Sequence, residues 1–158
     1  MEKHFIFKLQ QEDFNLADEH QKIRSLTKNT GAIVTFTGLV RELLDDQTRL
    51  EKLELSTYAA LVENQLKNLK HHIEENFTID HMTIIHRYGQ LKPHEQIVFV
   101  GTASQHRNQA FMATQMAMDF LKSQIAFWKK EIYQSGSDKT KHRWIEPTEQ
   151  DYQSFKQW

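Results

Sequence analysis

The apolar positions of this chain recur with two different periods, and each period predicts one kind of element. A spacing of three and four residues is typical of a helix with one buried face, and a run rich in β-branched and aromatic residues is typical of a buried strand. Helices and strands therefore mix along the chain, with an antiparallel pair expected at 78–103, and the predicted class is α+β. The helical spacing covers residues 15–27, 59–77 and 108–123, and the strand pattern covers residues 31–41, 52–57, 78–87 and 96–103.

The spacing also assigns an inner face to each predicted helix. The polar segment 134–142 is predicted to be a mobile loop inside one domain that covers residues 1–158. The expected inner faces are Leu16, His20, Ile23 and Leu26 in the first helix, Tyr58, Leu61, Val62, Gln65, Leu66, Leu69 and Ile73 in the second, and Ala110, Phe111, Thr114, Ala117, Met118 and Leu121 in the third.

Composition excludes several kinds of chemistry. The 158 residues include no cysteine, which excludes disulfide scaffolds, cysteine-bound zinc, iron–sulfur clusters and thiol nucleophiles. Nine histidines are present, but His81 and His86 are an odd number of residues apart on a predicted strand and so point to opposite faces. We therefore expect solvated or hydrogen-bonded histidines and no metal site.

Charge and hydropathy set the expected surroundings of the chain. The net charge of -1 argues against a strongly basic nucleic-acid coat protein. The most apolar stretch, residues 31–40, is about half the length that a membrane span needs. We therefore expect a cytoplasmic protein with neither a membrane nor a nucleic acid as its partner.

The sequence SQHR at 104–107 places two basic side chains where a buried strand gives way to a helix. Side chains at such a junction are held by rigid elements yet open to solvent, and a helix N-terminus attracts anions. His106 and Arg107 are therefore candidate anion ligands. The structural alternative is a polar cap for the helix, with Ser104 as the capping residue.

Two lysines near the end of the third predicted helix form a second candidate site. If the helix continued past Lys122 to Lys129, the two side chains would lie about 20° apart around its axis and share a face. Neighbouring ammonium groups lower each other's pKa, which makes a lysine a useful acid or base. Alternatively, the lysines extend into solvent from the helix end, and Phe127 and Trp128 belong to the core.

Positive charge is concentrated around these lysines. Residues 122–143 carry a local charge of +4 in a chain of net charge -1, and Arg41 follows the apolar run at 31–40. Such a region suits an anion site. It is also compatible with a non-enzymatic anion- or nucleic-acid-binding module, although few exposed rings are expected there for base stacking.

Four sequence blocks, taken in order and at their spacing, resemble the MoaE family, the large, catalytic subunit of molybdopterin synthase. The resemblance extends from about residue 3 to Trp158 and implies a single α/β-hammerhead-like domain with an antiparallel sheet and packed helices. The blocks are GAIVTFTGLVRE, HRYGQLKPHE with IVFV, SQHRNQAF, and LKSQIAFWKKE with a late RW.

The resemblance implies a sulfurtransferase of molybdenum cofactor biosynthesis. Members of the family convert cyclic pyranopterin monophosphate into molybdopterin by inserting the two sulfurs of its dithiolene. The sulfur arrives as a thiocarboxylate on the C-terminal Gly-Gly tail of a small ubiquitin-like partner subunit, so the large subunit binds no cofactor of its own. Two large subunits form a homodimer with one small subunit at each end, a heterotetramer in which each active site includes residues of the neighbouring large subunit.

The resemblance also implies roles for individual residues. Lys122 is expected to act as general acid or base, or to stabilise an oxyanion, with Lys129 as its charge partner. Arginine and histidine would bind the phosphate and the pterin through charge-assisted hydrogen bonds. The expected substrate-binding residues are Leu39, Val40, Arg41, His106, Arg107, Lys122, Lys129, Lys130, Glu131 and Arg143.

Two departures from the family concern the local backbone. This chain has Ala126 where the family often has proline, and His94 where the family often has a glycine in its hairpin turn. The course of the chain between Lys122 and Lys129 is therefore left open by the sequence.

Overall fold

The computed structural model describes residues 4–136 and 140–158, and this part of the chain forms two four-stranded sheets and four helices. The α+β class predicted from the sequence is confirmed. The strands are β1 (His4–Gln10), β2 (Ala32–Leu39), β3 (Thr48–Thr57), β4 (His81–Arg87), β5 (Gly89–Leu91), β6 (Gln96–Ser104), β7 (Phe127–Ser135) and β8 (Thr140–Ile145). The helices are α1 (Leu16–Leu26), α2 (Ala59–Asn76), α3 (Arg107–Ser123) and α4 (Glu149–Lys156).

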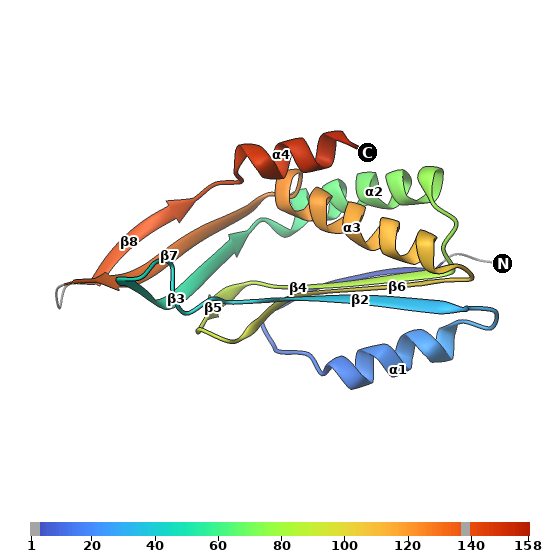
Figure 1. Ribbon diagram of the computed structural model, residues 1–158, viewed down its shortest axis with the longest axis horizontal. Helices are drawn as coiled ribbons and strands as arrows, with labels where there is room; N and C mark the ends of the chain where they lie inside the picture. Colours follow the sequence, from blue (N-terminus) through green and yellow to red (C-terminus); the bar gives the residue numbers. More distant parts are fainter. Residues whose placement is uncertain (1–3, 137–139) are drawn as a thin grey trace.

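The first sheet has the strand order β1-β4-β6-β2 and separates two layers of helices (Figure 1). On one face, Ile23 of α1 packs against Ile85 and Phe99. On the other face, α2 and α3 bury the main core against β4 and β6. The predicted antiparallel pairing of β4 with β6 is confirmed, whereas β1 joins β4 in parallel.

Helical spacing predicted the buried stripe of α2 but overestimated the width of the inner faces. Four apolar residues of α2 are buried as expected: Val62, Leu66, Leu69 and Ile73. Six other residues expected on inner faces are exposed instead: Leu16, His20, Leu26, Tyr58, Leu61 and Phe111. On α3 the buried positions include Ala110, Ala113 and Ala117, so the helix lies close to the sheet and Phe111, which is 60% exposed, turns away from the contact.

The strand predicted at 31–41 exists, but it is not a buried strand. β2 lies at the edge of the first sheet and pairs with β6 alone. Phe36 is 39% exposed and Leu39 is 55% exposed. A continuous apolar run does not distinguish a central strand from an edge strand whose apolar side chains line a cavity or are exposed.

The second sheet has the order β5-β3-β7-β8 and extends away from the helices (Figure 1). Its own small core contains Leu53 and Leu55, the alternating pair expected on one face of β3. The predicted mobile loop at 134–142 is wrong where the structure describes it, because residues 134–135 end β7 and residues 140–142 begin β8. Residues 137–139 lie outside the described residues. Five of the six residues of β8 are exposed, so this strand has no apolar alternation that a sequence pattern could reveal.

Candidate active site

A cavity of about 440 Å³ lies where the C-terminal end of α3 meets the first residues of β7 and the ends of β2, β4 and β6. Three nitrogen-bearing side chains line it: His86, Lys122 and Lys129. A larger cavity of about 670 Å³ lies between β1 and α2, but none of the residues predicted for the site lines it. The apolar wall of the smaller cavity includes Phe36, Leu39, Ile97, Val98, Met118 and Leu121.

Lys122 and Lys129 meet through a turn, not along a continuous helix. α3 ends at Ser123, and β7 begins at Phe127. Between them, the N–H of Ala126 donates to Gln65 Oε1 at 2.8 Å, and the Ala126 carbonyl accepts from Thr57 Oγ1 at 3.2 Å. A proline at this position would have no N–H to donate, so Ala126 adds a contact to α2 that the more usual family residue lacks. The two lysines therefore share one site, as expected, but they do so through a helix-to-strand turn. That turn is held by hydrogen bonds to both the N–H and the carbonyl of Ala126.

The environment of Lys129 makes it a much weaker base than a solvated lysine. Burial, together with the positive charge of Lys122, lowers the pKa of Lys129 to about 8, while Asp151 opposes this shift. Both protonation states are then populated near neutral pH, which is the condition for general acid–base work. Phe127 and Lys129 lie on the same face of β7 because side chains two residues apart in a strand share a face.

Asp151 of α4 supplies negative charge close to both lysines. Its carboxylate completes a capping box by accepting from the Thr148 N–H at 2.8 Å and from the Thr148 hydroxyl at 2.9 Å. Partial burial would raise the pKa of Asp151, but these hydrogen bonds and the charges of Lys122 and Lys129 outweigh it and hold the pKa below its usual value. The sequence reasoning did not find Asp151, because nothing in its spacing connects α4 to the lysines.

His86 also lines the cavity and was not among the predicted site residues. Its ring stacks on Phe127 with centroids 3.8 Å apart and an interplanar angle of 12°. Burial lowers the pKa of His86 to about 4, and the charge of Lys129 contributes, although the hydrogen bond to the Arg87 backbone acts in the opposite direction. Histidines were expected to be either solvated or hydrogen-bonded, and His86 is hydrogen-bonded and buried. The spacing of the histidines along the chain carries no information on which of them packs beside the lysines.

The three residues at the end of β2 have different environments. Leu39 lines the cavity, whereas the side chain of Val40 belongs to the small core of the second sheet. The backbone of Val40 is engaged by the hairpin turn: its N–H donates to the Glu95 carbonyl at 2.9 Å and its carbonyl accepts from the His94 N–H at 2.8 Å. Arg41 is exposed.

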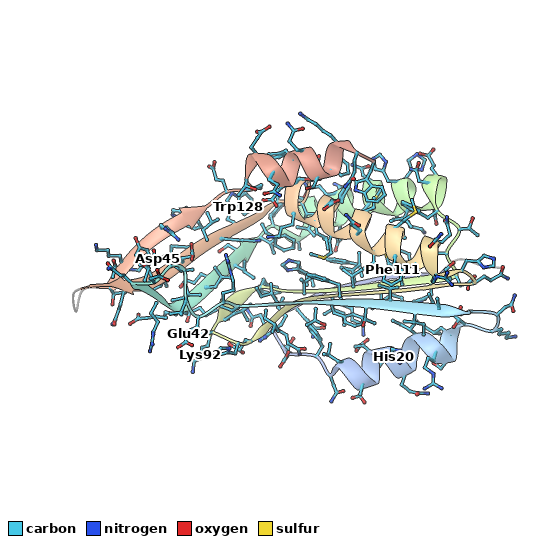
Figure 2. The ribbon with its side chains drawn as sticks, in the orientation of Figure 1. His20, Glu42, Asp45, Lys92, Phe111 and Trp128 are labelled. Atoms are coloured by element: carbon cyan, nitrogen blue, oxygen red, sulfur yellow. The ribbon has the colours of Figure 1, made fainter. Side chains whose placement is uncertain are left out.

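His106 and Arg107 lie at the opposite end of α3 from the lysines. His106 is the N-cap residue, Arg107 is the first helical residue, and both are exposed. At about 1.5 Å per residue, roughly 22 Å of helix axis separates Arg107 from Lys122. Figure 2 labels Phe111 in the N-terminal part of α3 and Trp128 near the start of β7, and the two lie toward opposite ends of that helix. One copy of the chain therefore does not bring these two predicted groups into one site.

The expected capping role of Ser104 is partly confirmed. Its hydroxyl accepts from the His106 N–H at 3.4 Å and donates to the Thr78 carbonyl at 2.8 Å. His106 itself makes no side-chain capping bond. The polar cap thus involves Ser104, and the side chain of His106 does not cap the helix.

The remaining predicted residues lie on both faces of β7 and its neighbour β8. Lys130 is on the opposite face from Lys129, paired with Glu54 at 3.0 Å and placed 5.6 Å from the ring centroid of Trp144. Glu131, which is 4% exposed, shares the face of Lys129 and accepts a hydrogen bond from Arg143 Nε at 2.9 Å. The segment 122–143 therefore does not present its cations on one surface in the part that the structure describes.

Two further observations limit what the described residues contain. Among residues 4–136 and 140–158, no group of three or more histidine, aspartate or glutamate side chains is arranged to hold a metal ion. No helix in that same part of the chain is both long enough and apolar enough to cross a membrane.

Comparisons of the sequence and of the structure with known proteins find relatives of one family. The family model described as MoaE protein matches residues 9–124 of this chain. A molybdopterin synthase catalytic subunit from Brucella melitensis is 40% identical over 147 residues, which cover 93% of this chain and 86% of the relative. A molybdopterin biosynthesis MoaE protein from Burkholderia ambifaria has a TM-score of 0.78 and 31% identity, with 97% of each chain covered. A complex of subunits 1 and 2 of molybdopterin-converting factor from Helicobacter pylori has a TM-score of 0.66 over 84% of this chain and 91% of that chain, and its 16% identity makes this a likeness of fold alone.

Proposed function

This chain belongs to the MoaE family, and we propose that it acts as a molybdopterin synthase catalytic subunit, a sulfurtransferase of molybdenum cofactor biosynthesis, with residues 1–158 as one catalytic-subunit domain. In this reaction, sulfur passes from the C-terminal thiocarboxylate of a small ubiquitin-like partner to cyclic pyranopterin monophosphate and forms the dithiolene of molybdopterin. The observation that carries the proposal is the cavity shared by Lys122 and Lys129, in which the pKa of Lys129 is lowered to about 8.

The lysines suit the two charged species that the reaction brings together. The thiocarboxylate tail and the substrate phosphate are both anions, and a cavity with two lysines attracts them. When the thiocarboxylate sulfur attacks a precursor carbon, a C–S bond forms and a C–O bond of the precursor breaks, its oxygen leaving as water or on the phosphate group. The tail is then joined to the precursor as a thioester, and water hydrolyses this bond to leave the sulfur on the precursor as a thiolate and the tail as a carboxylate. Lys122 stabilises the oxyanion of that hydrolysis or transfers its proton, and Lys129 provides the neighbouring charge. The chain contains no cysteine, which agrees with a sulfur atom carried by the partner.

A second copy of the chain supplies His106 and Arg107 to each site. These residues lie at the far end of α3 from Lys122, so they reach a lysine cavity only from a neighbouring subunit. The proposed assembly is a homodimer of catalytic subunits with one small subunit at each end, a heterotetramer. The Helicobacter pylori protein of similar fold was solved in a complex of subunits 1 and 2 of molybdopterin-converting factor, and the partner proposed for this chain is of the same kind.

The other binding roles follow from the same assembly. Leu39 lines the cavity and Arg41 follows it by two residues, so these side chains would contact the pterin or the partner's tail. Arg143 is paired with the buried Glu131, and Lys130 is paired with Glu54 on the opposite face of β7. In these pairs both cations stabilise the second sheet, and they bind substrate only if it displaces their carboxylate partners. The subunit itself needs no cofactor, and the proposed location is the cytoplasm.

The alternative of a nucleic-acid-binding module is not favoured, although the expectation of few exposed rings near the cations was wrong, because Trp128 is 49% exposed and Trp144 just beyond the segment is 62% exposed. Two of the cations in the 122–143 segment, Lys130 and Arg143, are paired with Glu54 and Glu131. The relatives are named molybdopterin synthase catalytic subunits and not nucleic-acid-binding proteins. A salt titration of oligonucleotide binding would reveal such a module through steeply salt-dependent affinity at physiological salt.

The direct test is reconstitution of the reaction. The purified chain is mixed with a small subunit carrying a C-terminal Gly-Gly thiocarboxylate and with cyclic pyranopterin monophosphate, and molybdopterin is measured. The proposal predicts one dithiolene for every two thiocarboxylates consumed. Unchanged precursor in the presence of a folded chain and an intact thiocarboxylate would contradict it.

A further inference from the structure

The lysine cavity contains a third nitrogen-bearing group whose orientation is fixed by the fold. We propose that His86 is a substrate-binding residue: Nε2 of its imidazole accepts a hydrogen bond from an N–H group of the pterin held in the cavity. This inference rests on the proposed function of the cavity and adds a recognition element to it. No role for His86 followed from the sequence or from the family resemblance.

Two contacts hold the ring of His86 in place. Its Nδ1 lies 2.8 Å from the carbonyl oxygen of Arg87, which can only accept a hydrogen bond. One ring face is stacked on Phe127. The residue as a whole is 5% exposed, so the ring is oriented by packing as well as by the hydrogen bond.

These contacts determine which nitrogen faces a ligand as an acceptor. Because Nδ1 donates to the Arg87 carbonyl, it carries the hydrogen, and Nε2 of the neutral ring carries a lone pair. Burial and the nearby Lys129 keep the ring neutral at physiological pH, since they lower the pKa of His86 to about 4. Among the residues that the structure describes, no side chain or backbone group donates a hydrogen bond to Nε2. Nε2 is not among the buried side-chain atoms without a partner, so it is open to the cavity that His86 lines, and there its donor is either water or the molecule that binds.

The three polar groups of the cavity define the chemistry of its ligand. Lys122 and Lys129 offer positive charge and donors, whereas His86 offers a neutral acceptor, and the apolar wall between them includes Leu39 and Met118. A ligand that satisfies all of these is an anion with a flat, partly apolar body and at least one N–H group. A pterin phosphate has this combination, and a simple inorganic anion lacks the N–H.

The test measures binding of cyclic pyranopterin monophosphate and of inorganic phosphate by calorimetry to the full chain. His86→Phe keeps a ring for Phe127 to stack on and removes the acceptor, and the dissociation constant for the pterin is expected to rise about tenfold, the loss of roughly one hydrogen bond. His86→Gln restores an acceptor oxygen, and its dissociation constant is expected to stay within about threefold of the wild type. Affinity for inorganic phosphate is expected to be unchanged in both variants.

A matched control lies on the same strand. His81 is also buried in β4, but it is on the other face, where its Nε2 lies 2.6 Å from the Thr83 hydroxyl. His81→Gln is expected to leave the pterin affinity unchanged. If His86→Phe fails to fold, nitrogen NMR of the wild type replaces it: adding the pterin shifts the Nε2 resonance of His86 and leaves that of His81 in place.

The outcomes separate this inference from the proposed function. Equal pterin affinity in the wild type and in folded His86→Phe, or an Nε2 resonance that does not move when the pterin binds, would overturn the role of His86 alone. A wild-type chain that neither binds nor converts the pterin would instead overturn the proposed function of the cavity.

Discussion

Lys122 and Lys129 line one cavity although the first lies in the last turn of α3 and the second lies near the start of β7. The turn at residues 124–126 joins the helix to the strand, and one residue of each lines the same cavity. Burial and the charge of Lys122 together lower the pKa of Lys129 to about 8. The charge state of one lysine is therefore expected to depend on the other.

Replacing Lys122 with glutamine is expected to raise the pKa of Lys129. The positive charge of Lys122 is one cause of the lowered value, so its removal moves the pKa from about 8 towards 10.5. The shift is measured by carbon NMR of lysine side chains over a pH titration. The rise stays incomplete because burial, the larger cause, is still present.

Lys130→Gln is the matched control for this titration. It removes the same charge from the next residue of the same strand, but Lys130 is on the opposite face and paired with Glu54. The pKa of Lys129 is expected to stay near 8 in this variant. Equal shifts in Lys122→Gln and Lys130→Gln would show that net charge, and not the shared cavity, controls Lys129.

Replacing Lys129 with methionine is expected to stabilise the fold at neutral pH. The folded pKa of about 8 lies below the ordinary lysine value of 10.5, so the unfolded chain binds more protons between these values and the wild type gains stability as pH rises through that window. Below pH 8 the lysine is charged in both states, and burial of the charge destabilises the folded state. Lys129→Met removes this cost, and we expect a gain of about 1–2 kcal/mol at pH 7, measured by urea unfolding.

The pH dependence distinguishes this mechanism from ordinary improvement of packing. The stability difference between Lys129→Met and the wild type is expected to shrink between pH 8 and pH 10, because the wild type then loses its buried charge. A difference of the same size at pH 7 and pH 10 would show that the methionine stabilises only through apolar contacts.

Replacing His94 with glycine is expected to stabilise the hairpin turn between β5 and β6. His94 has a φ of 72°, in the left-handed region where a Cβ atom is unfavourable, and the family often has glycine there. We expect His94→Gly to raise the free energy of unfolding by about 0.5–1 kcal/mol, since relief of strain exceeds the greater flexibility of glycine in the unfolded chain. The change is read from the midpoint of chemical unfolding.

His94→Ala tests whether the Cβ atom is the cause. Both substitutions remove the 3.4 Å contact between His94 Nε2 and Glu42, but alanine keeps the Cβ. We therefore expect no gain in stability from His94→Ala. A gain of the same size from alanine would mean that the imidazole, and not the backbone conformation, destabilises this turn.

Most elements of the fold are visible in the sequence because their burial is one-sided and regular. The stripe of α2 and the pair β4 and β6 follow directly from apolar spacing. The errors occur where the burial of a side chain depends on tertiary contacts, which apolar spacing along the sequence does not reveal. Phe36 and Leu39 are apolar but lie on an edge strand, and Phe111 is one step around α3 from the alanines that contact the sheet.

The candidate site was only partly predictable for a related reason. The sequence showed two lysines near one apolar face, but their meeting depends on a turn fixed by Gln65 and Thr57, which are more than 50 residues away in the chain. His86 and Asp151 reach the lysines from β4 and α4 through tertiary packing alone. The separation of Arg107 from Lys122 likewise appears only when the length of α3 is known.

A mixture of two inactive variants tests whether each site combines the lysine pair of one copy with the basic residues of another. Lys122→Ala and Arg107→Ala are each expected to form almost no molybdopterin, because each lacks one part of every site. Co-expressed with different affinity tags, they form mixed dimers in which one of the two sites has both parts intact. Random pairing restores about a quarter of the wild-type molybdopterin formation, and dimers purified through both tags restore about half. Mixed dimers as inactive as either variant alone would contradict a site built from two copies of this chain around Lys122 and Lys129.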